Sequence, residues 1–334
     1  MKLQQYFKGL LLLFLCFALV FSNPTILDKN ENEVYVNITL AKPLEKRADI
    51  GIYTSSVGNY LISKYVTRNI YYDGLKNLDI YNDKSNNKKN KPVIIYICGG
   101  TWVFGEKSFY SLLGDYLSKI GYVTVIPNYA QFPFGNVNDM IHDISSAINW
   151  TYNNIEKYNG DNRNMILLGH SSGAHLSALT LIRNSLDISG DKEFSGIREL
   201  PQFQKTILLG GPYDFDLFSD IAKKTGEVPE NSNFEIFAQT ILGSKYSCPT
   251  DILKSFGDKS IQNLSTNSFI LVHSTLDNVV PLSSASGLAD QIRRTSNIPV
   301  NIYYADGFQH CGITEGVMSG DINARNTLKS IIES

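Results

Sequence analysis

The sequence predicts an α/β fold built on a mostly parallel sheet, because short apolar runs alternate with segments of helical periodicity from about Tyr71 onward. Six of these runs are rich in β-branched and aromatic residues and are mostly apolar on both faces, which is typical of strands that helices cover on either side. They span residues 92–98, 122–127, 164–169, 205–211, 268–273 and 300–305. No linker divides the chain, so we expect one folded unit.

Residues 139–158 are the clearest helix candidate, because their apolar residues recur at steps of three and four and so form one stripe. The stripe comprises Ile141, Ile144, Ile148, Tyr152 and Ile155. Residues from about 184 to 266, apart from the strand at 205–211, depart from the simple alternation and are richer in loop formers. We expect them to include a small cap over the carboxyl edge of the sheet, where open α/β sheets bind ligands.

The first 22 residues are predicted to direct the chain rather than to fold with it. Lys2 and Lys8 precede an apolar run at 9–21 that is short for a bilayer span, and Ser22 offers a small residue for cleavage. This pattern is typical of a secretory signal peptide, and an uncleaved anchor is the alternative. Either way, the charges place the N-terminal extension (23–66) and the α/β domain (67–334) on the lumenal side. We expect a protein that is secreted or lies in the endoplasmic reticulum lumen, with a protein anchored in the endoplasmic reticulum or Golgi membrane as the alternative.

Three Asn-x-Ser/Thr sequons, at Asn37, Asn149 and Asn263, agree with a secretory compartment, although such tripeptides also arise by chance in a chain rich in asparagine. Asn37 is the expected glycan acceptor, because it precedes the α/β domain.

Four cysteines are present, and one of them lies within the predicted signal peptide. The odd number that remains rules out a fully paired framework. One bridge, between Cys248 and Cys311, and a set of buried free thiols are both open.

The stretch Gly169-His170-Ser171-Ser172-Gly173 places a serine between two glycines, after an apolar run and before an amphipathic one. A strand, a sharp turn and a helix in this order are what a nucleophile elbow requires, so the pattern predicts Ser171 as a nucleophile. Small residues flank the serine because the turn is strained and the helix passes close by. The alternative is a turn serine that caps the helix.

A serine hydroxyl needs a base and an orienting acid before it can attack a carbonyl carbon. His310 follows the last predicted strand, and Asp277 lies in the loop after the strand before it. Both loops belong to the carboxyl edge, in the chain order serine, acid, histidine. We assign Asp277 as the acid and His310 as the base, the alternative being that Asp277 only organises its turn. His170 and His175 lie too close to Ser171 to act as its base and are expected to pack or cap.

Negative charge on the substrate oxygen must be stabilised by hydrogen-bond donors, and residues 98–102 follow the first central strand with a pair of glycines that can turn N–H groups inward. We assign the N–H of Ser172 and a second one from Gly99, Gly100 or Thr101 to this oxyanion hole. An ordinary turn between a strand and a helix is the alternative. The chemistry needs no cofactor, and no Cys/His cluster with the sequence spacing of a metal site is present.

Taken together, these stretches resemble the esterase branch of the α/β-hydrolases, and most specifically isoprenylcysteine methylesterase-like proteins, with kynurenine formamidases as close relatives. The similar stretches run in order from residue 68 to 281, and "GFQH" extends them to His310. They are "RNIYYDGLKNLDIY", "GGTWVFGEK", "SLLGDYLS", "PNYAQFPFGNVNDMIHDI", "NIEKYNGD", "LLGHSSGAHL" and "HSTLDNVVP". The resemblance implies an eight-stranded, mostly parallel sheet and assigns the catalytic roles to Ser171, Asp277 and His310.

Two features depart from this family. Cys98 stands where the oxyanion motif usually opens with histidine or a small residue. The family's prenylated methyl ester substrates face the cytosol, where a lumenal domain would not meet them.

The sequence therefore predicts a serine hydrolase that cleaves a small-molecule or lipid-like carboxylic ester through an acyl-enzyme. A net charge of −2 argues against a nucleic-acid partner. Two alternatives are an amide hydrolase of formylated aromatic metabolites, suggested by "GHSSGAH" and Trp102, and an inactive hydrolase fold that only binds a ligand.

Overall fold

The computed structural model describes residues 50–85, 88–188, 199–215, 241–242 and 246–334, together with the backbone of two short paired strands, β1 (Thr25–Ile26) and β2 (Val36–Asn37). The predicted signal peptide, most of the predicted extension and much of the predicted cap, at 189–198, 216–240 and 243–245, lie outside the described residues. Among the described residues, no helix has the length and apolar character needed to cross a bilayer.

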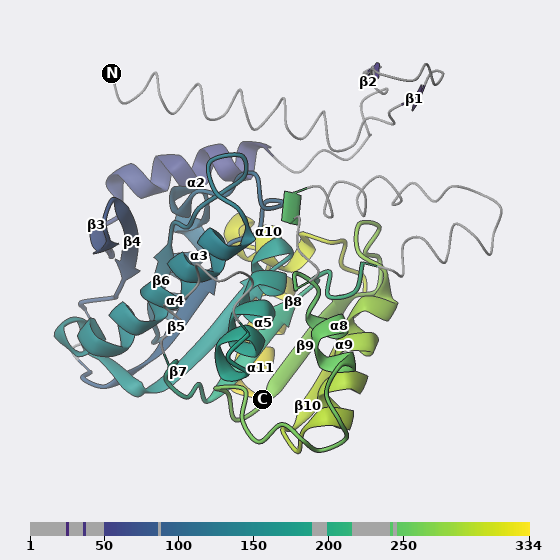
Figure 1. Cartoon of the computed structure of the whole chain (residues 1–334). Coiled ribbons are helices and arrows are strands. Elements are labelled where there is room, and N and C mark those ends of the chain that lie inside the picture. The colour runs from purple at the N-terminus through teal and green to yellow at the C-terminus, as the bar shows by residue number, and fades with distance from the viewer. Residues whose placement is uncertain are drawn as a thin grey trace.

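Eight strands form one sheet in the order β10-β9-β8-β7-β5-β6-β4-β3 (Figure 1). They are β3 (Val66–Asp73), β4 (Lys76–Tyr81), β5 (Lys91–Ile97), β6 (Val123–Pro127), β7 (Gly160–His170), β8 (Lys205–Leu209), β9 (Phe269–Ser274) and β10 (Val300–Ala305). β4 pairs antiparallel with β3 and with β6, whereas the other neighbours are parallel. The predicted fold class and the eight-stranded, mostly parallel sheet are confirmed.

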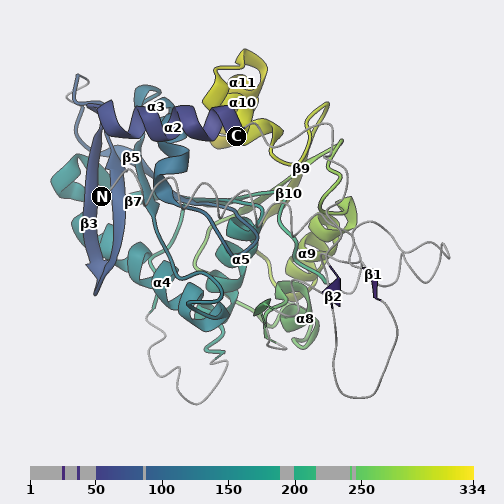
Figure 2. The same cartoon turned by 90° about the horizontal axis from the view of Figure 1, so that it is seen from above.

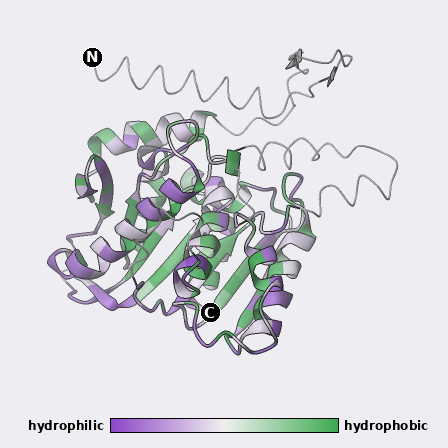
Figure 3. Ribbon diagram, viewed as in Figure 1, coloured by the Kyte–Doolittle hydropathy of each residue, from purple (hydrophilic) through white to green (hydrophobic). Residues whose placement is uncertain are grey.

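The six apolar runs all became strands, and their continuous hydrophobicity has a direct cause. β5 and β7 are central, and their inner residues are buried because helices cover both faces of the sheet. Figure 3 shows these strands in the colours of hydrophobic residues, with hydrophilic residues on the surrounding helices. β3 and β4 were not among the six runs. The edge strand β3 alternates between exposed and half-buried residues, and the short strand β4 includes Lys76, Asn77 and Asp79. Gly74, in the turn between them, has a φ of 49° that glycine adopts readily.

Helices cover both faces of the sheet, as Figure 2 shows from above. One face carries α2 (Ile50–Ile62), α3 (Ser111–Lys119), α10 (Gly312–Ser319) and α11 (Ile322–Glu333). The other carries α4 (Val137–Asn154), α5 (Ser172–Ser185), α8 (Pro249–Lys254) and α9 (Leu282–Thr295). Because strands β5 to β10 run parallel, their carboxyl ends lie at one edge of the sheet, and the loops that follow them meet there.

The predicted helix at 139–158 corresponds to α4 followed by a 3-10 turn, η2 (Ile155–Tyr158). It begins earlier than predicted, because the Asn136 side chain caps the amides of Asn138 and Asp139. One member of the predicted stripe was wrong, since Tyr152 is exposed. The neighbouring Thr151 takes the buried position, and its hydroxyl donates to the Ala147 carbonyl.

Helix α2 lies within the predicted N-terminal extension and packs against α3 and α10. Its Tyr60 is buried beside the ammonium group of Lys107, with a hydrogen-bonding distance of 3.2 Å to the hydroxyl. The same ammonium group lies 2.7 Å from the Asp79 carboxylate on β4, and both charged side chains are fully buried. This buried pair fixes η1 (Lys107–Tyr110), the 3-10 turn that follows the predicted oxyanion loop.

Candidate active site

Ser171 lies in the tight turn between β7 and α5, at the carboxyl edge of the sheet. Its backbone has φ 53° and ψ −125°, a conformation that costs a non-glycine residue on the order of 1–3 kcal/mol. The turn is held because the Ser171 N–H donates to the Leu209 carbonyl at 2.8 Å. A Cβ at Gly169 would lie 2.6 Å from the Gly173 carbonyl oxygen, and one at Gly173 would lie 2.2 Å from the Ile97 carbonyl oxygen. Both glycines are therefore required by close approaches of the backbone.

The structure brings the three predicted triad residues into one hydrogen-bonded chain. Nε2 of His310 lies 2.9 Å from Oγ of Ser171, and Nδ1 of His310 lies 2.8 Å from Oδ2 of Asp277. The two loops that carry the acid and the base are joined to each other, because the N–H of Leu276 donates to the carbonyl of Phe308 at 3.0 Å. In this geometry His310 can take the serine proton while Asp277 orients the imidazole.

The surroundings of Asp277 keep its carboxylate ionised. Burial alone would raise the pKa of Asp277, but the His310 charge, the His310 hydrogen bond and two backbone N–H donors lower it below its usual value. Those donors are the amides of Val279 and Val280, each 2.9 Å from Oδ1. Asp277 thus organises its turn with one oxygen and holds His310 with the other, so the two roles weighed from the sequence coexist.

The predicted oxyanion loop has its carbonyl groups held by hydrogen bonds. The hydroxyl of Tyr129 donates to the Cys98 carbonyl at 2.7 Å, and the hydroxyl of Tyr110 to the Gly99 carbonyl at 3.3 Å. The Gly100 carbonyl accepts from two following amides.

Within the described part of the chain, by contrast, no acceptor is found for the N–H groups of Gly99, Gly100 or Thr101. The same holds for the Ser172 amide, at the first position of α5, where a helix leaves its amides unpaired. Gly99 also lies against the elbow, since a Cβ there would be 3.0 Å from the Cβ of Ser171. These amides are available to an oxyanion formed at Ser171.

A buried contact that the sequence did not reveal supports this loop. The indole N–H of Trp102 donates to Nδ1 of His175 at 3.1 Å, and Nε2 of His175 lies 2.7 Å from the Ser247 carbonyl. Thr101 and Trp102 both have positive φ values, 52° and 62°, so the loop needs such an anchor. Burial lowers the pKa of His175 to about 4, so the ring is neutral and can accept from the indole. "GGTW" and "SGAH" were visible signals, but nothing in the sequence pairs them.

Another nearby histidine, His170, packs against His310, with ring centroids 5.2 Å apart. Its Nε2 lies 3.1 Å from the His310 carbonyl oxygen. Burial, aided by the charge of His310, lowers the pKa of His170 to about 4. A neutral His170 places no second positive charge beside the catalytic imidazole.

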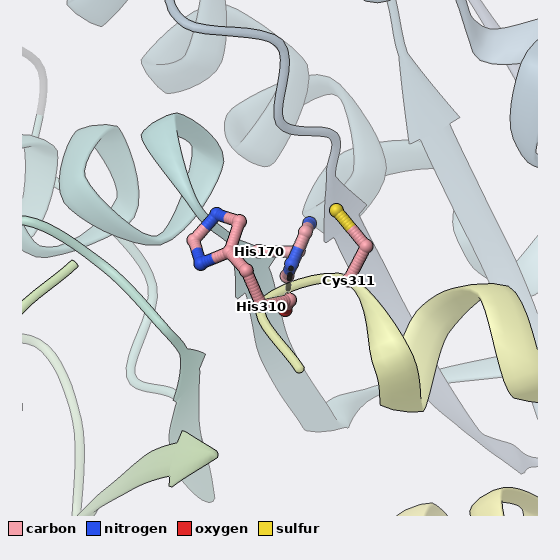
Figure 4. A group of neighbouring side chains, drawn as sticks. All are labelled: His170, His310 and Cys311. Carbon is pink, nitrogen blue, oxygen red and sulfur yellow. Dashed lines mark hydrogen bonds between the residues drawn. The ribbon is translucent and has the colours of Figure 1, made fainter. Parts of the chain in front are cut away.

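The cysteines are free thiols in the described residues, so the bridge between Cys248 and Cys311 that the sequence left open is not formed. Cys311 instead lies with His170 and His310, with one candidate ligand atom from each within 4.8 Å of the others (Figure 4). The expectation that no such cluster is present rested on the spacing of cysteine and histidine along the sequence. The fold, by contrast, joins residues that are distant in sequence.

The sequons differ in their surroundings. Asn263 is exposed, whereas Asn149 is half-buried on α4 and its side-chain amide donates to the Ser145 carbonyl. The side chain of Asn37 lies outside the described residues.

The fold and the site define the class of protein. A parallel sheet, a strained serine elbow, an acid and a histidine on the last two strand loops, and unpaired amides beside the serine characterise an α/β-hydrolase. The chain belongs to the BD-FAE family, whose profile matches residues 78–292. The matched region contains the nucleophile and the acid and ends before His310.

Curated relatives and solved structures agree with this class. A probable isoprenylcysteine alpha-carbonyl methylesterase of Oryza sativa subsp. japonica is 28% identical over 257 residues, covering 75% of this chain and 58% of that protein. Esterase LipC of Mycobacterium tuberculosis is 27% identical over 243 residues, covering 70% and 56%. The chain therefore spans a little over half the length of these relatives.

Among solved structures, esterase B from Lactobacillus rhamnosis superposes with a TM-score of 0.63 at 15% identity, covering 86% of this chain and 93% of that one. Esterase 2 of Thermogutta terrifontis superposes with a TM-score of 0.58 at 18% identity, covering 79% and 91%. At these identities the likeness establishes the shared fold.

Proposed function

We propose that the protein is a serine hydrolase that cleaves carboxylic esters through an acyl-enzyme. The observation that carries the proposal is the hydrogen-bonded chain from Ser171 through His310 to Asp277, beside amides that have no other acceptor in the described residues. The names of the relatives, which include methylesterases and an esterase, support an ester rather than another acyl compound.

The geometry supports a double displacement. Oγ of Ser171 bonds to the ester carbonyl carbon while its proton passes to Nε2 of His310, and Asp277 holds the imidazolium that forms. The oxyanion accepts from the Ser172 amide and from an amide of residues 99–101. The bond to the alcohol then breaks as His310 protonates the leaving oxygen. Water repeats the sequence on the acyl-enzyme, which releases the acid and the serine.

The triad supports the type of reaction, whereas the class of substrate is inferred from the relatives and from the residues around Ser171. Methyl esters of prenylated cysteine are one candidate, because several relatives are named for that reaction. An aryl formamide is the other candidate, which the sequence suggested through "GHSSGAH" and Trp102. Trp102 is instead fully buried and is used by His175, so that residue does not favour the amide.

A substrate screen with the purified chain tests the proposal. Short-chain and long-chain p-nitrophenyl esters, a prenylcysteine methyl ester and an N-formyl arylamine would be compared, each with the Ser171→Ala variant as the blank. The proposal expects ester turnover that the variant lacks. Turnover of the formamide alone would support the amide hydrolase, and turnover of none of the esters would contradict the proposal.

We also propose that the α/β domain is lumenal or secreted and that residues 1–22 deliver it there, either as a cleaved signal or as a membrane anchor. The basic start, the short apolar run and the sequons support this. Protease treatment of intact microsomes tests it, with protection expected until detergent is added. Glycosidase should shift the band, and Asn263→Gln should reduce that shift if this exposed sequon is used. A domain digested on intact microsomes would contradict the proposal and would favour the cytosolic prenylcysteine esters.

A further inference from the structure

A second set of chemical groups surrounds the catalytic histidine. His170 ends β7, His310 lies in the loop after β10, and Cys311 follows His310 immediately before α10. A ring nitrogen of each histidine and the sulfur of Cys311 all lie within 4.8 Å of one another. Figure 4 shows the His170 ring between the His310 ring and the Cys311 sulfur.

Two imidazoles and a thiol form a donor set suited to zinc and similar divalent ions. In a tetrahedral zinc site, with Zn–N about 2.1 Å and Zn–S about 2.3 Å, two ligand atoms lie roughly 3.5 Å apart. Separations within 4.8 Å therefore require only small movements of the side chains. Nε2 of His170 already lies 3.1 Å from the His310 carbonyl, whereas no partner for its Nδ1 is found in the described part of the chain.

Metal binding here is incompatible with catalysis. In the triad, Nδ1 of His310 faces Asp277 and Nε2 faces Ser171, so both ring nitrogens are in use. A metal ion that takes either nitrogen must break one of these hydrogen bonds. If it takes Nε2, the serine loses its base, and if it takes Nδ1, the imidazole loses the carboxylate that orients it.

We propose that His170, His310 and Cys311 form an inhibitory site for a zinc-class divalent cation. Binding forms one metal–sulfur and two metal–nitrogen bonds and releases the Cys311 thiol proton to solvent. A fourth coordination position is left for water. Because a proton is released, the metal concentration needed for half inhibition falls as the pH rises.

The second cluster of potential ligands in the described residues provides a control. Asp214, Cys248 and Asp251 also converge, but the ammonium group of Lys254 lies 3.3 Å from Asp214 and 2.7 Å from Asp251. That cation already forms ion pairs with both carboxylates. Cys248→Ser therefore removes a buried free thiol that the proposed site does not use.

The first test measures ester hydrolysis in zinc-buffered solutions and so rests on the proposed function. Each protein is compared with its own metal-free rate. Zinc should inhibit the wild type and EDTA should restore its rate. Cys311→Ser and His170→Asn should raise the half-inhibiting zinc concentration by about tenfold or more, the scale on which a metal site responds to lost support. Cys248→Ser should leave it unchanged. Equal sensitivity of Cys311→Ser and the wild type would overturn the proposal.

The second test does not depend on activity, so it separates failure of the metal site from failure of the proposed function. Cobalt(II) is added to the metal-free proteins, and the near-ultraviolet absorption of a cobalt–thiolate bond is recorded. The band is expected with the wild type, Cys248→Ser and Ser171→Ala, and not with Cys311→Ser. A wild type without the band, or a band that persists in Cys311→Ser, would contradict a site at Cys311 even in an enzyme that hydrolyses esters.

Discussion

The Trp102 indole N–H and Nδ1 of His175 lie 3.1 Å apart in the interior of the protein, where both side chains are fully buried. The contact joins the predicted oxyanion loop to α5, the helix that begins directly after Ser171. Because the Gly99–Trp102 segment includes two non-glycine residues with positive φ, its conformation depends on this contact and on the carbonyl hydrogen bonds from Tyr110 and Tyr129.

Trp102→Phe should therefore lower kcat with little change in KM. The substitution keeps a ring but removes the donor, which leaves a buried acceptor on His175 unpaired at a cost of about 1–3 kcal/mol. If the whole cost raises the activation free energy, kcat falls about 5- to 150-fold. Steady-state kinetics on a p-nitrophenyl ester measure it. Trp150→Phe, on α4 beside Tyr158, is the matched control and should be near wild type. A change confined to KM, or the same loss in both variants, would show that the contact does not position the loop.

Asp277→Asn should reduce kcat by roughly ten-thousandfold, because an amide favours the wrong tautomer of His310. Asp214→Asn is the control, since Asp214 pairs with Lys254 rather than with a histidine. The kcat of this control should be within a few-fold of the wild-type value, once it is corrected for the fraction of folded protein measured by circular dichroism. The assignment of the acid fails if the Asp214 variant is the crippled one.

The free energy of unfolding should fall as the pH is lowered from about 6.5 to about 4, partly through His170 and His175. Burial depresses the folded pKa of both to about 4, so over this range the unfolded chain binds protons that the folded chain does not. The stability that the two neutral histidines contribute is fully present above the pKa of histidine in the unfolded chain. It is lost as the pH falls through their pKa in the folded chain. Each pKa unit corresponds to about 1.4 kcal/mol.

His175→Gln isolates one of these two contributions. The variant should be less stable than the wild type at pH 7, and its deficit should shrink by on the order of 2 kcal/mol at pH 4.5. Urea denaturation at the two pH values measures both deficits. Equal deficits would mean that His175 is not held neutral by the fold.

The sequence predicted the triad because the order of the parallel strands determines which loops meet. Ser171, Asp277 and His310 each follow a strand, and parallel strands end at one edge, so their proximity needs no knowledge of side-chain packing. The position of residues 99–101 beside Ser171 was predictable for the same reason, whereas their oxyanion role stays a prediction.

Contacts that depend on side-chain conformations were not predictable. The Trp102–His175 hydrogen bond and the approach of Cys311 to His170 each join residues that no periodicity relates. The edge strand β3 was not predicted because its half-exposed residues give no apolar run. Tyr152 was wrongly assigned to the buried stripe, because the Thr151 hydroxyl bonds to a carbonyl of the same helix and Thr151 can therefore be buried in its place.

The central claim is that Ser171 is an activated nucleophile, and covalent labelling tests it most directly. A fluorophosphonate probe is incubated with the purified chain, and the modified residue is located by peptide mass spectrometry. The account predicts one adduct, on Ser171, that is absent from Ser171→Ala and much slower to form in His310→Ala. A folded wild-type protein that acquires no adduct, or one labelled at another serine with Ser171 unmodified, would contradict it.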